Sequence, residues 1–172
     1  MKVKDAMKTD VGFCSTNDSL MKVADTMRSR DCGVVPIVDD AQKTVGMLTD
    51  RDVCLAIAAR NRKASDVKAS ELIKGKVVSC LADDNLENAL RKMRKYRIKR
   101  LAVVDKGDVL VGILSIADAL LAVRKDKKLK KKIYSTIKTI VKPSPIVLRE
   151  IVSDNGVPDT DALIASSKSR AE

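Results

Sequence analysis

The strongest constraint on the fold of this chain is an internal repeat. With an offset of 66 residues the sequence overlays on itself without a gap: VVPIVD at 34–39 falls on RLAVVD at 100–105, and VGMLTDRD at 45–52 falls on VGILSIAD at 111–118. This agreement indicates that one folding unit is present twice, so every motif has to be interpreted as one of a pair.

Each copy has the residue pattern of a short strand, a helix, two more strands and a closing helix. Apolar residues recur at helical spacing after the N-cap candidates Asp18 and Asp84, which predicts the first helix of each copy. Pairs of β-branched runs joined by polar turns follow them. The closing helices are predicted at 52–60 and 116–123.

We therefore predict an α/β fold in which two β-α-β-β-α repeats pack about a pseudo-twofold axis, with a C-terminal helical extension. The predicted units are repeat 1 at 1–66, repeat 2 at 67–123, a basic amphipathic helix at 124–142 and a polar, partly flexible tail at 143–172.

The composition argues against several classes of function. The chain has no histidine, which removes histidine-based acid–base catalysis, Ser–His and Cys–His nucleophile pairs, and Cys/His zinc sites. The residues are 45% hydrophobic but only 2% aromatic, so the core is aliphatic and a stacking surface for single-stranded nucleic acid is not expected. With no nucleophile–base pair and no set of metal ligands in view, we do not expect an enzyme.

The cysteines and the apolar runs favour a cytoplasmic protein. The four cysteines form no C-x-x-C pair, so we expect reduced thiols that serve as small core residues, with a disulfide among Cys14, Cys32 and Cys54 as the alternative. No apolar run approaches the roughly 18 residues of a membrane span. The N-terminal MKVKDAMKTD also lacks the apolar region of a secretory signal.

A hydroxyl and a carboxylate stand at the same place in both copies, where the last strand meets the closing helix. Thr49 precedes Asp52 by three residues, and Ser115 precedes Asp118 by three. One interpretation is structural, because Ser or Thr is a good N-cap and Asp in the first turn suits the helix dipole. The other is a ligand site, because a carboxylate beside a cleft can accept hydrogen bonds from a cis-diol. Capping does not require an Asp in both copies, so the duplication favours a site.

The motifs GMLTDRD and GILSIAD, with the preceding strands CGVVPIVD and IKRLAVVD, resemble a tandem pair of CBS domains, the Bateman module, over roughly residues 1 to 123. The resemblance implies clefts between the repeats that bind AMP, ADP, ATP or S-adenosylmethionine, with no required cofactor. It implies that the Asp holds ribose hydroxyls and that the hydroxyl residue supports sugar or phosphate.

The resemblance also implies which residues line each cleft. The Asp118 site would be bordered by Gly12, Cys32, Gly33 and Ile113, and the Asp52 site by Met47, Val78 and Ile98. Lys99 and Arg100 take the place of a His-Arg pair that reaches nucleotide phosphates in the gamma subunit of AMP-activated kinase. We expect phosphates near them, since both cations suit phosphate. The alternative is that they belong to the solvated basic run at 91–100.

The segment after the repeats is strongly basic. Residues 124–142 carry nine Lys and Arg residues against Asp126, in a chain of net charge +11. Leu129, Ile133, Ile137 and Ile140 lie at helical spacing, which predicts an amphipathic helix over 127–141. This helix has three interpretations: it docks on the module or on a second subunit, it contacts nucleic acid through its charge, or it lies on an anionic membrane.

Two functions remain open. The first is a regulatory sensor in which an adenosine-containing ligand shifts the packing of repeats or subunits. The resemblance implies a flat homodimer for such a protein. The second is an interaction or stress-response protein with unoccupied clefts, which acts through its basic helix on a protein, nucleic acid or membrane.

Overall fold

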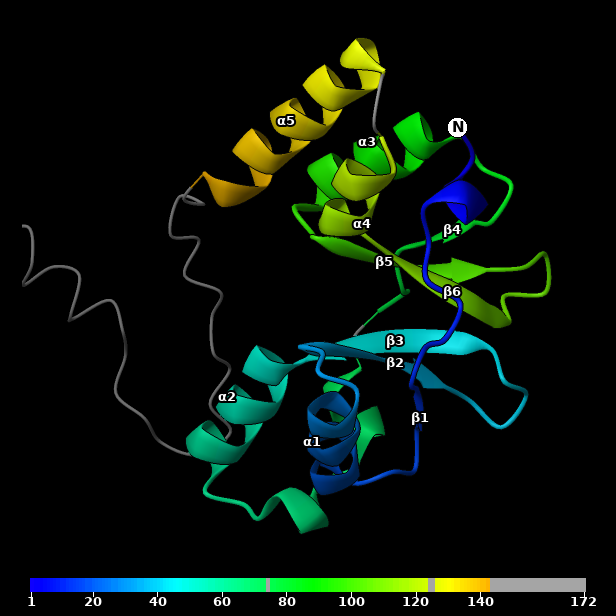
Figure 1. Ribbon diagram of the computed structural model, residues 1–172. Helices are drawn as coiled ribbons and strands as arrows, with labels where there is room; N and C mark the ends of the chain where they lie inside the picture. The colour runs from blue at the N-terminus through cyan, green and yellow to red at the C-terminus, as the bar shows by residue number, and fades with distance from the viewer. Residues whose placement is uncertain (74, 124–125, 143–172) are drawn as a thin grey trace, which may run out of the picture. The chain divides into compact units, whose positions relative to one another are not determined.

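The structure contains two small sheets of the same topology. The computed structural model describes residues 1–73, 75–123 and 126–142. The strand orders are β1-β2-β3 and β4-β5-β6, and helices accompany each sheet (Figure 1). In each sheet the first strand is parallel to the second, and the second is antiparallel to the third. The predicted α/β fold of two β-α-β-β-α repeats with a C-terminal helix is confirmed.

The elements of the two repeats correspond in order. The first repeat comprises β1 (Cys14–Ser15), α1 (Leu20–Ser29), β2 (Val34–Val38), β3 (Thr44–Thr49) and α2 (Asp50–Arg60). The second comprises β4 (Ser79–Leu81), α3 (Leu86–Tyr96), β5 (Arg100–Val104), β6 (Leu110–Ser115) and α4 (Ile116–Ala122). Short 3-10 helices lie at Val3–Asp5, Ala64–Asp66 and Ala69–Leu72, and α5 spans Lys127–Val141.

The pseudo-twofold relation appears in the strand register. The β2–β3 ladder shifts register between Ile37 and Val38, and the β5–β6 ladder shifts at the equivalent pair, Val103 and Val104. Lys43 forms an isolated antiparallel bridge with Val109, its own counterpart under the 66-residue offset. A residue that pairs with its equivalent lies next to the axis, so the axis passes between the two hairpins.

The first helix of each repeat begins one residue later than the predicted caps imply. The N-caps are Ser19, which accepts from the amide of Lys22, and Asn85, which accepts from the amide of Glu87. Asp18 and Asp84 instead accept the amide hydrogens of Ser15 and Leu81, and so hold the turn before each helix. The correction has a physical reason, because a carboxylate one residue before the cap reaches back to the strand end.

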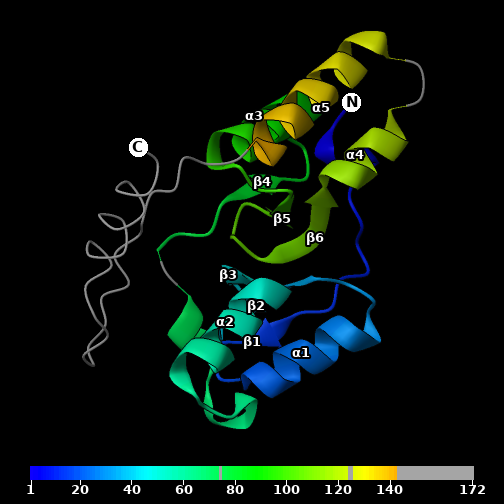
Figure 2. The same ribbon diagram turned by 90° about the vertical axis from the view of Figure 1, so that its left-hand side faces the viewer.

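The segment that leads into each repeat packs on the other repeat, and we call these two segments, residues 1–13 and 67–73, the crossover segments (Figure 2). Val3 is fully buried in the second repeat's core, while Val67 and Ala69 are fully buried in the first repeat's core. The bridges are equivalent too, since Lys2 pairs with Asn85 and Ser19 with Lys68. A boundary at residue 66 therefore separates each leading segment from the core that it completes, because the side chains of that segment are buried in the other repeat.

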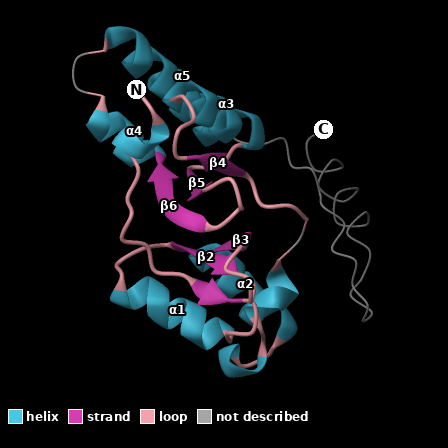
Figure 3. Cartoon of the chain, turned by 90° about the vertical axis from the view of Figure 1, so that its right-hand side faces the viewer, coloured by secondary structure: helices cyan, strands magenta, loops and turns pink. Residues whose placement is uncertain are grey.

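Helix α5 docks on the second repeat, which is the first of its three interpretations. Leu129 and Ile133 are buried in the core that contains α3 and α4 residues. An ion pair joins Lys132 of α5 to Glu87 at the start of α3, and the Arg97 guanidinium after α3 donates to the carbonyl of Lys142. The two helices therefore run parallel, side by side (Figures 1 and 3).

Two predictions about the rest of the chain have different outcomes. None of the helices in the described ranges combines the length and apolarity needed to cross a membrane. The predicted flexible tail at 143–172 lies outside the described residues.

Candidate ligand-binding site

The strand-to-helix junctions of both repeats are capping boxes. The Ser115 hydroxyl accepts the Asp118 amide hydrogen at 3.0 Å, and Oδ2 of Asp118 accepts from the Ser115 amide at 3.1 Å and its hydroxyl at 2.5 Å. In the first repeat, Thr49 and Asp52 make the same three bonds at 3.2, 2.8 and 2.7 Å. The structural interpretation of the motif is therefore correct, because the hydroxyl and the carboxylate cap the closing helix in both repeats.

Capping uses only one oxygen of each carboxylate. Oδ1 of Asp118 lies 3.7 Å from the Lys8 ammonium, and the Asp118 side chain is 14% exposed. Within the described ranges, no hydrogen bond or ion pair reaches Oδ1 of Asp52. A carboxylate offers acceptor sites on both oxygens, so capping and ligand binding do not exclude each other.

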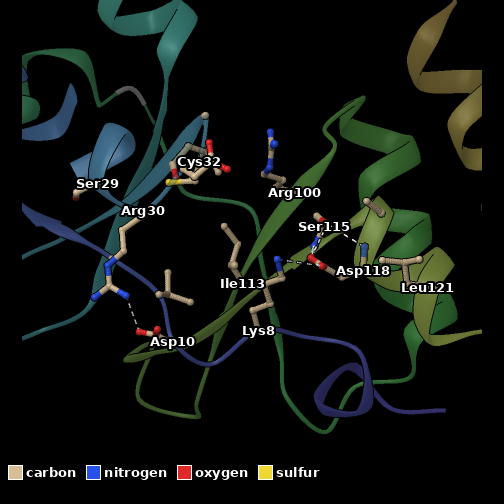
Figure 4. Close-up of a pocket in the computed structure, with 16 residues that line it drawn as sticks. Lys8, Asp10, Ser29, Arg30, Cys32, Arg100, Ile113, Ser115, Asp118 and Leu121 are labelled. Carbon is tan, nitrogen blue, oxygen red and sulfur yellow. Dashed lines mark hydrogen bonds and ion pairs between the residues drawn. The ribbon is translucent and has the colours of Figure 1, made fainter. Parts of the chain in front are cut away.

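A pocket of about 730 Å³ opens beside Asp118 (Figure 4). That volume falls within the range of roughly 300–1,000 Å³ typical of small-molecule sites. One wall comes from the end of β6 and the start of α4, the opposite wall from the turn between α1 and β2, and a third from the segment before β1. The sequence-predicted residues that line it are Gly12, Cys32, Gly33, Arg100, Ile113, Ser115 and Asp118.

The charged side chains of the pocket are divided between two sides. Arg30 and Asp10 form an ion pair at 2.8 Å on the side of the first repeat. Asp118 faces Lys8 on the side of the second repeat (Figure 4). Arg100 is exposed, and no hydrogen bond or ion pair engages its guanidinium within the described part of the chain. An exposed guanidinium without an ion-pair partner can bind an anionic group such as a phosphate.

Lys99 and Arg100 do not share this pocket. Arg100 opens β5 opposite Ser115 and lines the pocket, whereas Lys99 is absent from its lining. Under the repeat offset Lys99 corresponds to Gly33, which does line the Asp118 pocket. By the pseudo-twofold relation Lys99 lies on the Asp52 side of the molecule, and its contact with phosphate stays a prediction.

The residues predicted for the Asp52 site lie in equivalent places on the other side of the axis. Thr49 ends β3, Met47 lies half-buried within it, and Asp52 is exposed in the first turn of α2. Val78 and Ile98 are half-buried and pack on the second repeat's core. None of these residues lines the Asp118 pocket, and the Asp52 site stays a prediction.

Several pocket residues were missed by the sequence prediction. They are Lys8, Asp10, Val11, Ser29, Arg30, Asp31, Val34, Ala117 and Leu121. Lys8 and Asp10 enter because the N-terminal segment crosses from the second repeat to the first, and a backbone ladder between Lys8 and Ile113 fixes that path at 2.9 Å in both directions. No local sequence pattern predicts that the N-terminal segment crosses between the repeats. Arg30 could have been found, since it lies two residues before the predicted Cys32.

The four cysteines are free thiols with different environments. Cys14 and Cys80 are buried, as expected of small core residues, and burial raises the pKa of the Cys80 thiol to about 11. Cys32 is half-buried in the pocket wall, and Cys54 is exposed on α2. Within the described residues, no group of three or more Cys, Asp or Glu side chains could hold a metal ion.

The family of the chain follows from comparison with known proteins. The CBS domain model matches residues 3–59 and 69–125, which include both capping boxes. The chain therefore belongs to the CBS domain family and contains two CBS domains in tandem.

Similar proteins share this organisation. The CBS domain-containing protein YhcV of Bacillus subtilis is 35% identical over 116 residues, which cover 67% of this chain and 81% of that protein. Among solved structures, Hypoxic Response Protein I with two coordinated zinc ions is 27% identical, with a TM-score of 0.67 over 72% of this chain and 100% of that one. The CBS domain pair of protein MJ0100, in complex with 5-methylthioadenosine and S-adenosyl-L-methionine, is 29% identical, with a TM-score of 0.61 over 69% and 95%.

Proposed function

We propose that this protein is a non-catalytic regulatory sensor that binds an adenosine-containing ligand, of the class of AMP, ADP, ATP or S-adenosylmethionine, in the Asp118 pocket. The observation that carries this proposal is that the two oxygens of the Asp118 carboxylate have different partners. Oδ2 of Asp118 is held by the capping box, while Oδ1 remains beside Lys8 in a pocket lined by both repeats.

The pocket offers complementary groups for the two ends of a nucleotide. The capping box holds the Asp118 carboxylate in one orientation, so Oδ1 can accept from ribose hydroxyls without further ordering of the side chain. Arg100 and Lys8 supply positive charge for phosphate, and Ile113 with Val34 supplies apolar surface for a base. The complex of the MJ0100 CBS pair with two adenosyl compounds supports this class of ligand.

The regulatory step in this proposal is a change in how the two repeats pack. Lys8 and Gly12 belong to the crossover segment, Arg30 to the first repeat and Asp118 to the second. A ligand that bridges these parts favours the arrangement in which all of them reach it. The same proposal includes a cytoplasmic homodimer that needs no further cofactor and passes the ligand signal to a protein partner.

Thermal unfolding tests the proposal. We expect AMP, ADP, ATP or S-adenosylmethionine to raise the Tm as the ligand concentration increases. At one hundred times Kd, the ligand adds about 2.7 kcal/mol to the free energy of unfolding. The informative variant is Asp118→Asn, because the amide oxygen can still cap α4 while an amide nitrogen replaces the free acceptor. Its unliganded Tm should stay close to wild type while the ligand response is lost.

The matched control is Asp52→Asn, which makes the same change at the equivalent position of the first repeat. It should retain the response that arises from the Asp118 pocket. A wild-type ligand response in Asp118→Asn contradicts the assignment, and no response to any of the four compounds in wild type contradicts the ligand class.

Alkylation of the cysteines gives a second readout that does not depend on stability. Cys32 lines the pocket and Cys54 lies outside its lining, so each protein molecule contains a probe and a control. A bound ligand should slow alkylation of Cys32, measured by peptide mass spectrometry, and leave Cys54 unchanged. Equal rates at Cys32 with and without a stabilising ligand would place that ligand elsewhere.

A further inference from the structure

The two parallel helices α3 and α5 are strongly basic. Their sequences, LENALRKMRKY and KKLKKKIYSTIKTIV, contain ten basic residues and one acidic residue, Glu87. That carboxylate is already used in an ion pair with Lys132. Lys92 is paired as well, with Asp84 at 4.0 Å, so the remaining eight cations of the two helices have no ion pair within the described residues.

The cations of the two helices lie on one continuous surface. Lys132 and Lys128 of α5, with Arg91 of α3, all lower the pKa of Glu87, the largest effect being the hydrogen bond from Lys132. These side chains therefore surround one carboxylate at the seam between the helices. At the other end of the seam, Arg97 donates to the carbonyl of Lys142.

The exposed lysines of α5 follow the face opposite to its docked stripe. Lys127, Lys131 and Lys138 are all exposed, whereas Leu129 and Ile133 are buried. The helix is roughly 22 Å long at 1.5 Å per residue, which spans about six phosphates of one DNA strand at 3.4 Å each. The row of exposed lysines is thus long enough to contact several phosphates of one strand.

We propose that the outer faces of α3 and α5 form a binding surface for the phosphate backbone of a nucleic acid duplex. The contacts are electrostatic and independent of base sequence, since long Lys and Arg side chains on helix faces reach phosphates and displace condensed counterions. This surface is separate from the Asp118 pocket, because none of the charged α3 or α5 residues lines that pocket.

The packing of α5 decides between a duplex and a membrane. An interfacial helix binds a bilayer by burying its apolar face among the lipids. In this protein that face is committed to the second repeat's core, where Ile133 is fully buried and Leu129 is 4% exposed. Binding to a bilayer would require α5 to detach from the core, whereas a duplex can contact the exposed lysines while α5 stays docked. Tyr96 and Tyr134 are the two aromatic residues of these helices, which is too few for a stacking platform of single-stranded type.

The test measures binding of the full chain to a fluorescent 25-base-pair DNA duplex and the matching RNA duplex at several salt concentrations. We expect a Kd in the micromolar range at about 50 mM salt and a steep weakening toward 200 mM. The variant Lys127→Gln/Lys131→Gln/Lys138→Gln removes three exposed charges. It should lower affinity at least tenfold and make the slope of log K against log salt shallower by about 2.7.

The control variant removes the same number of charges from the first repeat. Lys22, Lys43 and Lys63 are exposed and lie outside α3 and α5, so Lys22→Gln/Lys43→Gln/Lys63→Gln has the same net charge as the test variant. It should bind the duplex nearly as well as wild type, and both variants should melt at the wild-type temperature. Equal loss of affinity in the two variants, absence of duplex binding at 50 mM salt, or tighter binding to phosphatidylserine vesicles than to the duplex would each overturn the proposal.

Discussion

Single residues at the strand ends serve both the fold and the candidate site. Asp118 closes a capping box with one oxygen and presents the other to the pocket. Position 112, in the same motif, is glycine for a structural reason. A Cβ at this position would lie 2.7 Å from the carbonyl oxygen of Lys8 and 3.0 Å from the sulfur of Met7. The glycine is thus required by the close approach of the crossover segment, and the carboxylate is the residue with capacity for a ligand.

We predict that Gly112→Ala destabilises the protein by about 1–3 kcal/mol, because the added methyl group meets backbone that cannot rotate away. Gly46→Ala is the matched control at the equivalent position, where the nearest atom, at 2.9 Å, belongs to the Ile73 side chain. A side chain can shift, so its cost should be smaller. Urea unfolding measures both values, and equal midpoints for the two variants would contradict this account.

Among the elements, the two crossover segments join the repeats, and α5 enlarges the core of the second repeat. The first crossover is fastened outside the core as well, since Lys4 and Lys2 donate to Asp83 and lower its pKa to about 2. Helix α5 adds Leu129 and Ile133 to the core of the second repeat, and the first repeat has no equivalent helix in the described residues. The second repeat therefore has the larger apolar core.

We predict that Ile133→Ala lowers the free energy of unfolding by about 2–5 kcal/mol, the range for truncating a fully buried aliphatic side chain. Val141→Ala on the same helix is the control, because Val141 is 63% exposed and its truncation should cost less than about 0.5 kcal/mol. Denaturant unfolding followed by circular dichroism measures both. Wild-type stability of Ile133→Ala would mean that the helix does not dock in solution.

At the scale of the whole molecule, the closing helices expose large apolar side chains that the fold does not bury. Leu55 on α2 is 52% exposed, and on α4 Leu120 is 46% exposed and Leu121 is 75% exposed. Leu55 and Leu121 are equivalents under the repeat offset, so the pseudo-twofold relation places similar apolar surface on both halves. We propose these leucines as the surface of the homodimer, because apolar side chains exposed in the monomer can be buried between subunits.

We predict that the wild-type protein has twice the 18.8 kDa chain mass in light scattering at micromolar concentration. Leu55→Glu should shift it toward the monomer, because a carboxylate would be desolvated in the interface. Met21→Glu is the control, since Met21 is 59% exposed on α1 and outside the closing helices. A monomeric wild type, or equal dissociation by both variants, would count against a dimer formed through these helices.

Much of the fold could be predicted because it depends on local patterns, whereas the seven predicted residues among the sixteen that line the Asp118 pocket were largely implied by the resemblance to CBS domains. The repeat offset, the helical and strand periodicities and the paired Thr49–Asp52 and Ser115–Asp118 motifs are all readable within short windows. The helix over 127–141 was predicted at the residues where it occurs. The caps at Ser19 and Asn85 were missed by one residue, because Asp18 and Asp84 are equally good local candidates and only the backbone path selects between them.

The sequence by itself determined that two copies of one α/β unit exist and that each ends in a hydroxyl and a carboxylate. Only the tertiary structure decided which side chains meet those carboxylates. The crossover segment brings Lys8 to Asp118, and of the chain neighbours Lys99 and Arg100 only Arg100 lines the Asp118 pocket. The physical reason is that periodicity encodes which face of an element is buried, whereas contacts between distant segments depend on how whole cores are completed.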